Sequence, residues 1–461
     1  MKKSVNRRDF LKTSSLAGIG ASLPFTGQPS EKRSQSNRPF QSKINIGVIG
    51  VGLRGGYHVQ LGLERTDCEV VAICDIDQAM IDRTKAFFTE KGKKQPQVYG
   101  LAEEAYLEML QDESIDAVLI ATPWRWHTTM AVAAMQAGKY VGLEVSGAFS
   151  LDECWQLVNT SEATGSHLFF LENVCYRRDV MAILNMVRQN LFGELIHLEC
   201  GYQHDLRGVK FNDGMTPYDS GVEFGEKGYS EARWRTQHSI QRNGDLYPTH
   251  GIGPVAQYIN INRGNRLLSL TSTSSKARGL HEYIVQHEKG GPQHPNARLE
   301  FKLGDVVTSM VKAVNGESII ISHDTSLPRP YSLGFRVQGT KGIWMAVNKS
   351  IHLEGRSPHH RWEDAKPYLE QYDHPLWKQY EQKATGAGHG GMDFFLYHAF
   401  VEHAKRDQSP PFDVYDAATW MAITPLSEQS IALGSQSVAI PDFTRGRWID
   451  RKVTFALDKE Y

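Results

Sequence analysis

The chain has 461 residues, of which 40% are hydrophobic and 22% are charged, as in a soluble globular protein with two or three domains. Its 51 Lys and Arg residues nearly balance 52 Asp and Glu residues, for a formal net charge of -1. This balance argues against nucleic acid or an anionic membrane as the main partner. No apolar run long enough to span a bilayer follows the N-terminal segment.

Residues 1–42 are predicted to be a targeting signal and linker, separate from the fold. Arg7 and Arg8 stand side by side before a short apolar stretch at residues 16–25, the pattern of a twin-arginine export signal. The alternative is a chance pair of arginines in a tail. The signal predicts a periplasmic or extracellular protein that folds around its cofactor before export. The five cysteines, an odd number without close pairing, are expected to be buried free thiols: Cys68, Cys74, Cys154, Cys175 and Cys200.

Residues 43–59 read as a buried strand that runs into a glycine turn and then a helix. Gly50, Gly52 and Gly55 form G-x-G-x-x-G. In this motif the first glycine allows the tight turn, the second lets a pyrophosphate approach the backbone, and the third lets helix and strand pack closely. The phosphate lies at the helix N-terminus. The motif predicts a dinucleotide site.

A second strand, residues 68–75, ends at Asp75, about 20 residues after the last glycine. An acid at this position accepts a ribose 2'-hydroxyl and repels a 2'-phosphate, which favours NAD over NADP. Asp77 is the alternative acid, although it lies beyond the strand end.

Helices and strands continue to alternate along the first third of the chain. Helices are expected near residues 78–91 and 128–136, and strands at 117–121 and 140–143. This alternation predicts a doubly wound parallel sheet, a Rossmann domain over residues 43–168. Trp124, His127 and Glu144 follow strand ends and are expected at the carboxyl edge, where ligands bind.

The stretches "GVIGVGLRG", "ICDID", "ATPWRWH" and "AGKYVGLEVSGA" together resemble the glucose–fructose oxidoreductase, inositol dehydrogenase and MocA family. The resemblance covers about residues 44–445. It implies an α/β fold in which residues 169–461 form a C-terminal domain on an open, mostly antiparallel sheet. That sheet would carry the substrate face and could mediate a homo-oligomer.

One departure separates this chain from the dehydrogenases of that family, which usually carry Glu-Lys-Pro where Glu144, Val145 and Ser146 stand. Val145 has no amine to handle a substrate proton. The stretches "GYQHDLRG", "YPTHGIGP" and "GHGGMD" instead resemble glycoside hydrolase family 109, the NAD-dependent α-N-acetylgalactosaminidases of the same superfamily.

This second resemblance implies a glycosidase that does not need two carboxylates across the scissile bond. Oxidation at sugar C3 acidifies the C2 proton, elimination expels the C1 substituent, water adds, and the hydride returns to C3. NAD would then stay tightly bound without being consumed. The expected substrate is a glycan that ends in α-N-acetylgalactosamine.

The resemblance also implies the roles of individual residues. The catalytic candidates are His250, Tyr247 and Tyr176. The candidates for binding the sugar are Tyr202, Arg235, Tyr247, His250 and Tyr331. The candidates for binding the cofactor are Gly50, Gly52, Leu53, Arg54, Gly55, Asp75, Trp124, His127, Glu144, Val145 and Asn173.

Two other hypotheses remain open at this point. One is a sugar or polyol oxidoreductase with net turnover of NAD(P), and the other is a catalytically idle protein that binds sugar or NAD. A metal site is not expected, because the remaining histidines lack a compact ligand pattern: His359, His360, His389, His398 and His403.

Overall fold

A computed structural model describes residues 40–457 and Tyr461. The predicted twin-arginine pair lies outside the described residues. Within residues 40–457, no helix is both long and apolar enough to cross a membrane. All five cysteines are buried and free, as predicted.

The first sheet contains six parallel strands in the order β3-β2-β1-β4-β5-β6. The predicted Rossmann sheet is therefore confirmed. Its strands are β1 (Ile44–Ile49), β2 (Cys68–Asp75), β3 (Gln97–Gly100), β4 (Ala117–Ile120), β5 (Tyr140–Leu143) and β6 (Leu168–Phe170). The strand order reverses between β1 and β4, which is where a doubly wound sheet binds its ligand.

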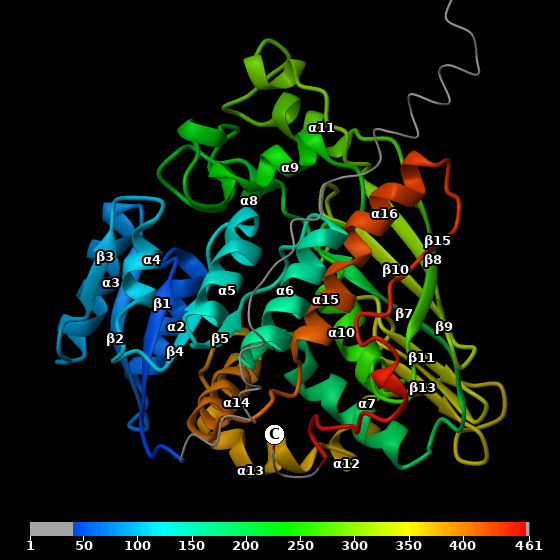
Figure 1. Ribbon diagram of the computed structural model, residues 1–461. Coiled ribbons are helices and arrows are strands. Elements are labelled where there is room, and N and C mark those ends of the chain that lie inside the picture. The colour runs from blue at the N-terminus through cyan, green and yellow to red at the C-terminus, as the bar shows by residue number, and fades with distance from the viewer. Residues whose placement is uncertain (1–39, 458–460) are drawn as a thin grey trace, which may run out of the picture. The chain divides into compact units, whose positions relative to one another are not determined.

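Helices connect these parallel strands, as Figure 1 shows for the blue and cyan part of the ribbon. They are α2 (Leu53–Leu63), α3 (Gln78–Glu90), α4 (Ala105–Leu110), α5 (His127–Gln136) and α6 (Leu151–Thr164). Local sequence sets their ends. Ser150 and Glu153 form a capping box at the start of α6, and Gly165 ends that helix at a φ of 71°.

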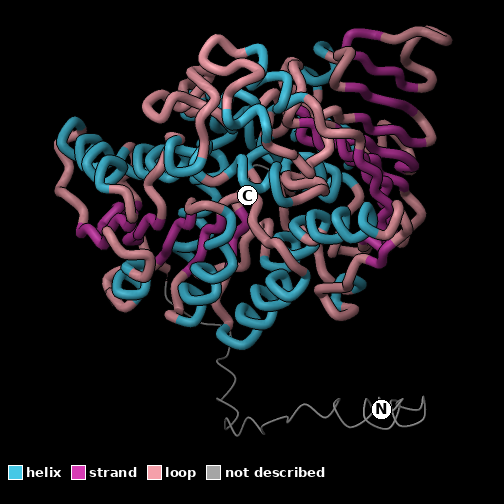
Figure 2. The backbone as a smooth tube through the Cα atoms, turned by 90° about the horizontal axis from the view of Figure 1, so that it is seen from above, coloured by secondary structure: helices cyan, strands magenta, loops and turns pink. Residues whose placement is uncertain are grey.

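The second sheet contains nine strands in the order β14-β13-β12-β11-β7-β10-β9-β8-β15. Only the β7–β10 pair is parallel, so this sheet is mostly antiparallel, as the resemblance implied. The strands are β7 (Leu195–Gln203), β8 (Leu267–Ser274), β9 (Val306–Ala313), β10 (Ser318–Asp324), β11 (Arg336–Gly339), β12 (Gly342–Met345), β13 (Ser350–Leu353), β14 (Glu363–Asp364) and β15 (Val438–Ala439). Figure 2 shows the two sheets as separate groups of strands.

The helices of the C-terminal region pack on one another and on this sheet. They are α7 (Arg178–Arg188), α8 (Arg207–Lys210), α9 (Arg235–Gln241), α10 (Thr249–Tyr258), α11 (Gly279–Gln286), α12 (Lys366–Gln371), α13 (Pro375–Ala384), α14 (Met392–Arg406), α15 (Val414–Met421) and α16 (Ile423–Ala432). Helix α14 also contacts β1 and α2 of the first sheet. One continuous buried core includes side chains from both sheets.

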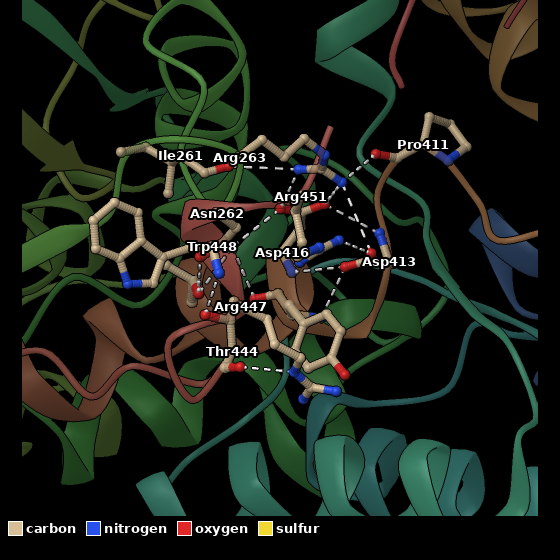
Figure 3. Close-up of polar contacts among 12 residues, drawn as sticks. Ile261, Asn262, Arg263, Pro411, Asp413, Asp416, Thr444, Arg447, Trp448 and Arg451 are labelled. Carbon is tan, nitrogen blue, oxygen red and sulfur yellow. Dashed lines mark hydrogen bonds and ion pairs between the residues drawn. The ribbon is translucent and has the colours of Figure 1, made fainter. Parts of the chain in front are cut away.

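A buried ion pair ties the start of α15 to a distant loop (Figure 3). The guanidinium of Arg263 donates to both carboxylate oxygens of Asp416, at 2.8 and 2.7 Å, and to the carbonyl of Pro411 at 3.0 Å. Arg451 pairs with the neighbouring Asp413. Removing one partner of a buried pair costs about 3–5 kcal/mol, so these contacts anchor the end of the chain.

Candidate functional site

The glycine turn after β1 has the geometry that a pyrophosphate needs. Gly50 adopts a φ of +81°, and a Cβ on Gly55 would lie 1.7 Å from the Gly50 carbonyl oxygen. Both positions therefore require glycine for the fold itself. A Cβ on Gly52, by contrast, would meet nothing within 4 Å, so the space in front of this backbone is open. Leu53 begins α2 directly after the turn.

Asp75 connects the glycine turn to the end of β2. Its Oδ2 accepts the N–H of Val51 at 2.7 Å, and its Oδ1 accepts the N–H of Asp77 at 2.9 Å. Burial raises the pKa of Asp75, against these hydrogen bonds. Asp77 caps α3 by accepting the N–H of Ala79, so its side chain belongs to the helix start. Asp75 is thus the acid at the strand end.

Arg54 and Glu144 form one ion pair of a buried network beside the glycine turn. Arg54 Nε lies 2.6 Å from Glu144 Oε1, and His58 Nε2 lies 2.7 Å from the same oxygen. Burial alone would raise the pKa of Glu144, but the charge of Arg54 and the hydrogen bond from His58 lower it to about 2. The N–H of Val145 donates to the other oxygen of Glu144 at 3.1 Å.

Helix α14 supplies the second carboxylate of this network, Asp393, whose side chain is fully buried. Arg54 donates to both of its oxygens, at 3.0 and 3.2 Å, and Asn173 Nδ2 donates at 2.7 Å. His389 Nδ1 lies 2.6 Å from Asp393 Oδ2. The carboxylates of Glu144 and Asp393 thus hold Arg54 from opposite halves of the chain. Sequence reasoning missed His58 and Asp393, whose partners are distant along the chain.

His127 is buried between the loops that follow β4 and β5. Its Nδ1 lies 2.7 Å from the Ser146 carbonyl and its Nε2 lies 2.8 Å from the Thr122 carbonyl. Both ring nitrogens are therefore used to hold two backbone segments together. Burial lowers the pKa of His127, so the ring is neutral at pH 7.

Five of the predicted sugar and catalytic residues gather into one aromatic and basic cluster at the end of β7. The ring centroids of Tyr202 and Tyr247 are 4.5 Å apart, and those of Tyr247 and His250 are 4.9 Å apart. Tyr331, which is 47% exposed, lies at the rim, 6.3 Å from Tyr202. The guanidinium of Arg235 lies 5.3 Å from the Tyr247 ring.

Close packing of α10 against β7 brings these residues together. A Cβ on Gly251 would lie 2.6 Å from the backbone nitrogen of Gly201, so only glycine permits this approach. The same helix then presents His250 to Tyr202, with centroids 5.4 Å apart. Trp124, from the end of β4, reaches the cluster and lies 5.6 Å from Tyr247.

His250 has a buried acidic partner that sequence reasoning missed. Its Nδ1 lies 2.7 Å from Oε1 of Glu172, whose side chain is fully buried. An imidazole that donates its Nδ1 proton to a carboxylate keeps the Nε2 lone pair for use as a base. A Cβ on Gly253 would lie 2.8 Å from Glu172 Cγ, so this glycine makes room for the pair.

A second histidine of the cluster, His204, was not predicted from the sequence. Its Nδ1 lies 3.0 Å from the hydroxyl of Tyr202, and its ring lies 4.9 Å from Tyr331. Burial raises the pKa of Tyr202 to about 12, against the charge of Arg235, so its phenol stays protonated at neutral pH. The "YQH" spacing on β7 is the signal that would have found His204, because residues two apart in a strand share a face.

Tyr176, the third predicted catalytic residue, lies in an aromatic core, and its role in catalysis stays a prediction. The residue is fully buried, and its ring lies 5.7 Å from Phe412 and 5.2 Å from Phe455. Its hydroxyl has no hydrogen-bond partner among the described residues. The described residues also contain no group of three or more His, Cys, Asp or Glu that could hold a metal ion.

Comparisons with known proteins agree with this two-part arrangement. Residues 44–171 match the oxidoreductase family with an NAD-binding Rossmann fold, and residues 176–450 match the C-terminal domain of glycosyl hydrolase 109. The chain belongs to glycosyl hydrolase family 109. Family 109 is a family of glycoside hydrolases, so the protein is an enzyme of that class, with NAD as the cofactor of its Rossmann domain.

Curated relatives cover nearly the whole chain. A glycosyl hydrolase family 109 protein of Stenotrophomonas maltophilia is 54% identical over 99% of this chain and 100% of its own length. A Tannerella forsythia protein named alpha-N-acetylgalactosaminidase is 52% identical over 98% of this chain and 99% of its own.

Solved structures support the fold. An NAD binding oxidoreductase from Klebsiella pneumoniae covers 87% of this chain and 99% of its own, with a TM-score of 0.65 at 17% identity. A levoglucosan dehydrogenase in complex with NADH and L-sorbose covers 87% of this chain and 100% of its own, with a TM-score of 0.63 at 18% identity.

The residues of the glycine turn fit NAD. The open space at Gly52 accommodates the approach of a pyrophosphate to the backbone, and the N-terminus of α2 provides unpaired N–H groups. The carboxylate of Asp75 accepts backbone N–H groups at both oxygens and keeps a lone pair for a ribose hydroxyl.

Proposed function

We propose that this family 109 enzyme hydrolyses terminal α-N-acetylgalactosaminides and uses NAD as a catalyst that is recycled within the site. The observation that carries the proposal is His250, which is paired with the buried Glu172 and surrounded by Tyr202 and Tyr247. The 52% identity to a relative named alpha-N-acetylgalactosaminidase supports the choice of substrate.

When bound, NAD supplies reversible hydride transfer at C3 of the sugar. The protein residues move the protons. His250, held by Glu172 through Nδ1, offers Nε2 as the base for a substrate proton. Tyr202 and Tyr247 are phenols whose pKa burial raises, so both can donate a hydrogen bond to a sugar oxygen.

Arg235 provides the positive charge of this site. Its guanidinium lies 5.1 Å from the Trp124 ring and 5.3 Å from the Tyr247 ring, which fixes its plane. A preorganised cation stabilises negative charge that develops on a substrate oxygen when the C2 proton is removed. Val145 brings no amine to this edge, which separates the site from one that uses a lysine for proton transfer.

One experiment separates the glycosidase from an oxidoreductase. We expect the purified protein to release nitrophenol from p-nitrophenyl α-N-acetylgalactosaminide without added NAD and without net NADH. In D2O the released sugar should carry deuterium at C2, because the base exchanges its proton with solvent. Stoichiometric NADH formation from free sugars, with no nitrophenol, would contradict the proposal.

We further propose export of the protein by the twin-arginine pathway to the periplasm or the medium. Arg7 and Arg8 before an apolar stretch support this localisation. We expect the Arg7→Lys/Arg8→Lys double variant to remain in the cytoplasm of the producing cells, as judged by fractionation and immunoblotting. Unchanged export of this variant would refute the proposal.

The homo-oligomer that the resemblance implies stays a prediction. Its test is the mass of the protein in solution, measured by light scattering.

A further inference from the structure

The buried network beside the glycine turn holds two carboxylates and one guanidinium. Arg54 pairs with Glu144 at 2.6 Å and with Asp393 at 3.0 Å. Burial alone would raise the pKa of both carboxyls, but the charge of Arg54 holds each pKa below its usual range, so both are ionised at neutral pH. Burial lowers the pKa of His58, which is therefore neutral. These four groups sum to one negative charge.

This network lies at the part of the first sheet that serves the nicotinamide half of a dinucleotide. A doubly wound sheet binds the two halves of NAD on opposite sides of the point where its strand order reverses. Asp75 follows β2 and so belongs to the adenosine half. Glu144 follows β5, and Asn173, which donates to Asp393 at 2.7 Å, follows β6. The network is therefore held at the strands of the nicotinamide side.

The network also lies close to the sugar cluster. Burial raises the pKa of Tyr247, and the charge of Glu144 acts in the same direction. Because the effect of a charge falls with distance, Glu144 lies near this tyrosine. Trp124, from the end of β4, contacts the same ring, with the centroids 5.6 Å apart. The negative network therefore faces the place where the cofactor and a sugar would meet.

The cationic side chains around this edge do not cancel the negative charge. Arg235 is paired with Glu231, and His250 is paired with Glu172. Arg83 donates to two backbone carbonyls of the glycine turn, on the side of the pyrophosphate. Its charge therefore acts on the phosphates rather than on the nicotinamide half.

We propose that the network of Glu144, Arg54 and Asp393 selects the oxidised form of the bound nicotinamide over the reduced form. An oxidised nicotinamide ring carries one positive charge, and a ring that has gained a hydride carries none. The net negative charge attracts the first and not the second. Because the side chain of Asp393 is fully buried and that of Glu144 is 6% exposed, water and salt screen this attraction little.

This preference makes the oxidised form the resting state and favours return of a hydride to the substrate. A net unit charge gives about a tenfold preference at a separation of about 12 Å and an effective dielectric constant of about 20, and a larger preference at shorter separations. For a two-electron couple, tenfold corresponds to about 30 mV. The preference concerns the cofactor alone, so it does not depend on the proposed substrate.

A redox titration of the holoenzyme without sugar tests the preference. The near-ultraviolet absorbance of reduced nicotinamide, measured anaerobically against dyes of known potential, gives the midpoint potential of the bound nucleotide. A pH of about 8.5 lies above the range in which histidines ordinarily change charge, so His389, which pairs with Asp393, does not cancel the network. We expect a midpoint about 30 mV more negative than that of free NAD. A midpoint no more negative than that of free NAD would overturn the proposal.

Two variants test whether the network causes the shift. Glu144→Gln and Asp393→Asn each remove one negative charge and keep the shape of the side chain, so each should move the midpoint by about 30 mV in the positive direction. The control Asp77→Asn removes a carboxylate from the adenosine side and keeps a side chain that can cap α3, so its midpoint should match that of the natural chain.

Equal shifts in all three variants, or a shift in none, would show that the network does not set the preference. If neither network variant folds with its nucleotide, the sign of the shift in the natural chain decides.

Discussion

His250 has a buried carboxylate at Nδ1, and the rings of Tyr202 and Tyr247 pack against its imidazole at steep angles. This arrangement predicts that His250→Gln lowers kcat by about a hundredfold to ten-thousandfold, the range that general acid–base catalysis contributes. NAD content and melting temperature should stay close to those of the natural chain. The measurement is nitrophenol release with absorbance of the bound nucleotide.

His359→Gln is the matched control, because His359 is exposed and has no partner of this kind. Its kcat should be unchanged. Equal losses in the two variants would show that His250 does not act as a base.

Glu144 makes the stability of the protein sensitive to acid. Its pKa is about 2 in the folded protein and 4.5 ordinarily, so the stabilisation is complete above the ordinary value and is lost as the pH falls from 4.5 toward 2. We expect the melting temperature of the natural chain to fall across this window more steeply than that of Glu144→Gln. Glu370→Gln, at an exposed glutamate, should follow the natural chain. Parallel curves for all three proteins would contradict the prediction.

Residue types at the sugar site were predictable, but their orientation was not. Tyr202 and Tyr176 are buried and Tyr247 is partly buried, all in aromatic surroundings, yet only the rings of Tyr202 and Tyr247 contact His250. Tyr176 packs against Phe395 of α14, Phe412 of the loop before α15, and Phe455 of the C-terminal segment. Glu172 was missed because its partner lies 78 residues later in the chain. Such contacts depend on tertiary packing that no local pattern encodes.

At the scale of elements, two glycines of the turn after β1 serve different ends. Gly55 is needed for folding, whereas Gly52 is needed for binding of the cofactor. Gly52→Ala should fold normally, because its Cβ meets nothing, but should lose bound NAD, because the methyl group occupies the space before the phosphate. Gly55→Ala should lower the melting temperature of the protein itself, because its Cβ would overlap the Gly50 carbonyl. Nucleotide released on denaturation, measured beside the melting temperature, distinguishes the two effects. Full NAD content in Gly52→Ala would contradict this assignment.

The ends of strands with strong local sequence patterns were predicted accurately. β2 and β5 match the expected residues 68–75 and 140–143 because apolar runs and flanking glycines or acids mark both ends. β3 was not expected, since Gln97–Gly100 contains one aliphatic residue and lies at the sheet edge. In the second sheet, strand order joins β7 to β10 and β11 across more than a hundred residues. The family resemblance predicted that sheet, and local hydrophobic periodicity could not have predicted the order of its strands.

At the scale of the whole molecule, the two sheets share one buried core. We therefore expect a single cooperative thermal transition of the holoenzyme, with tryptophan fluorescence and far-UV circular dichroism changing together. Two separate transitions by calorimetry would show that the Rossmann and C-terminal regions unfold independently and would refute this expectation.

The pairing of Arg54 with Asp393 has a consequence for the timing of synthesis. The ribosome makes Asp393 339 residues after Arg54, so the growing chain completes its glycine turn long before that arginine has its second carboxylate. In a nascent Rossmann segment, Arg54 is therefore paired with Glu144 but not yet with Asp393. If the predicted contact of Arg54 with NAD holds, we expect tight NAD loading only after α14 has been translated.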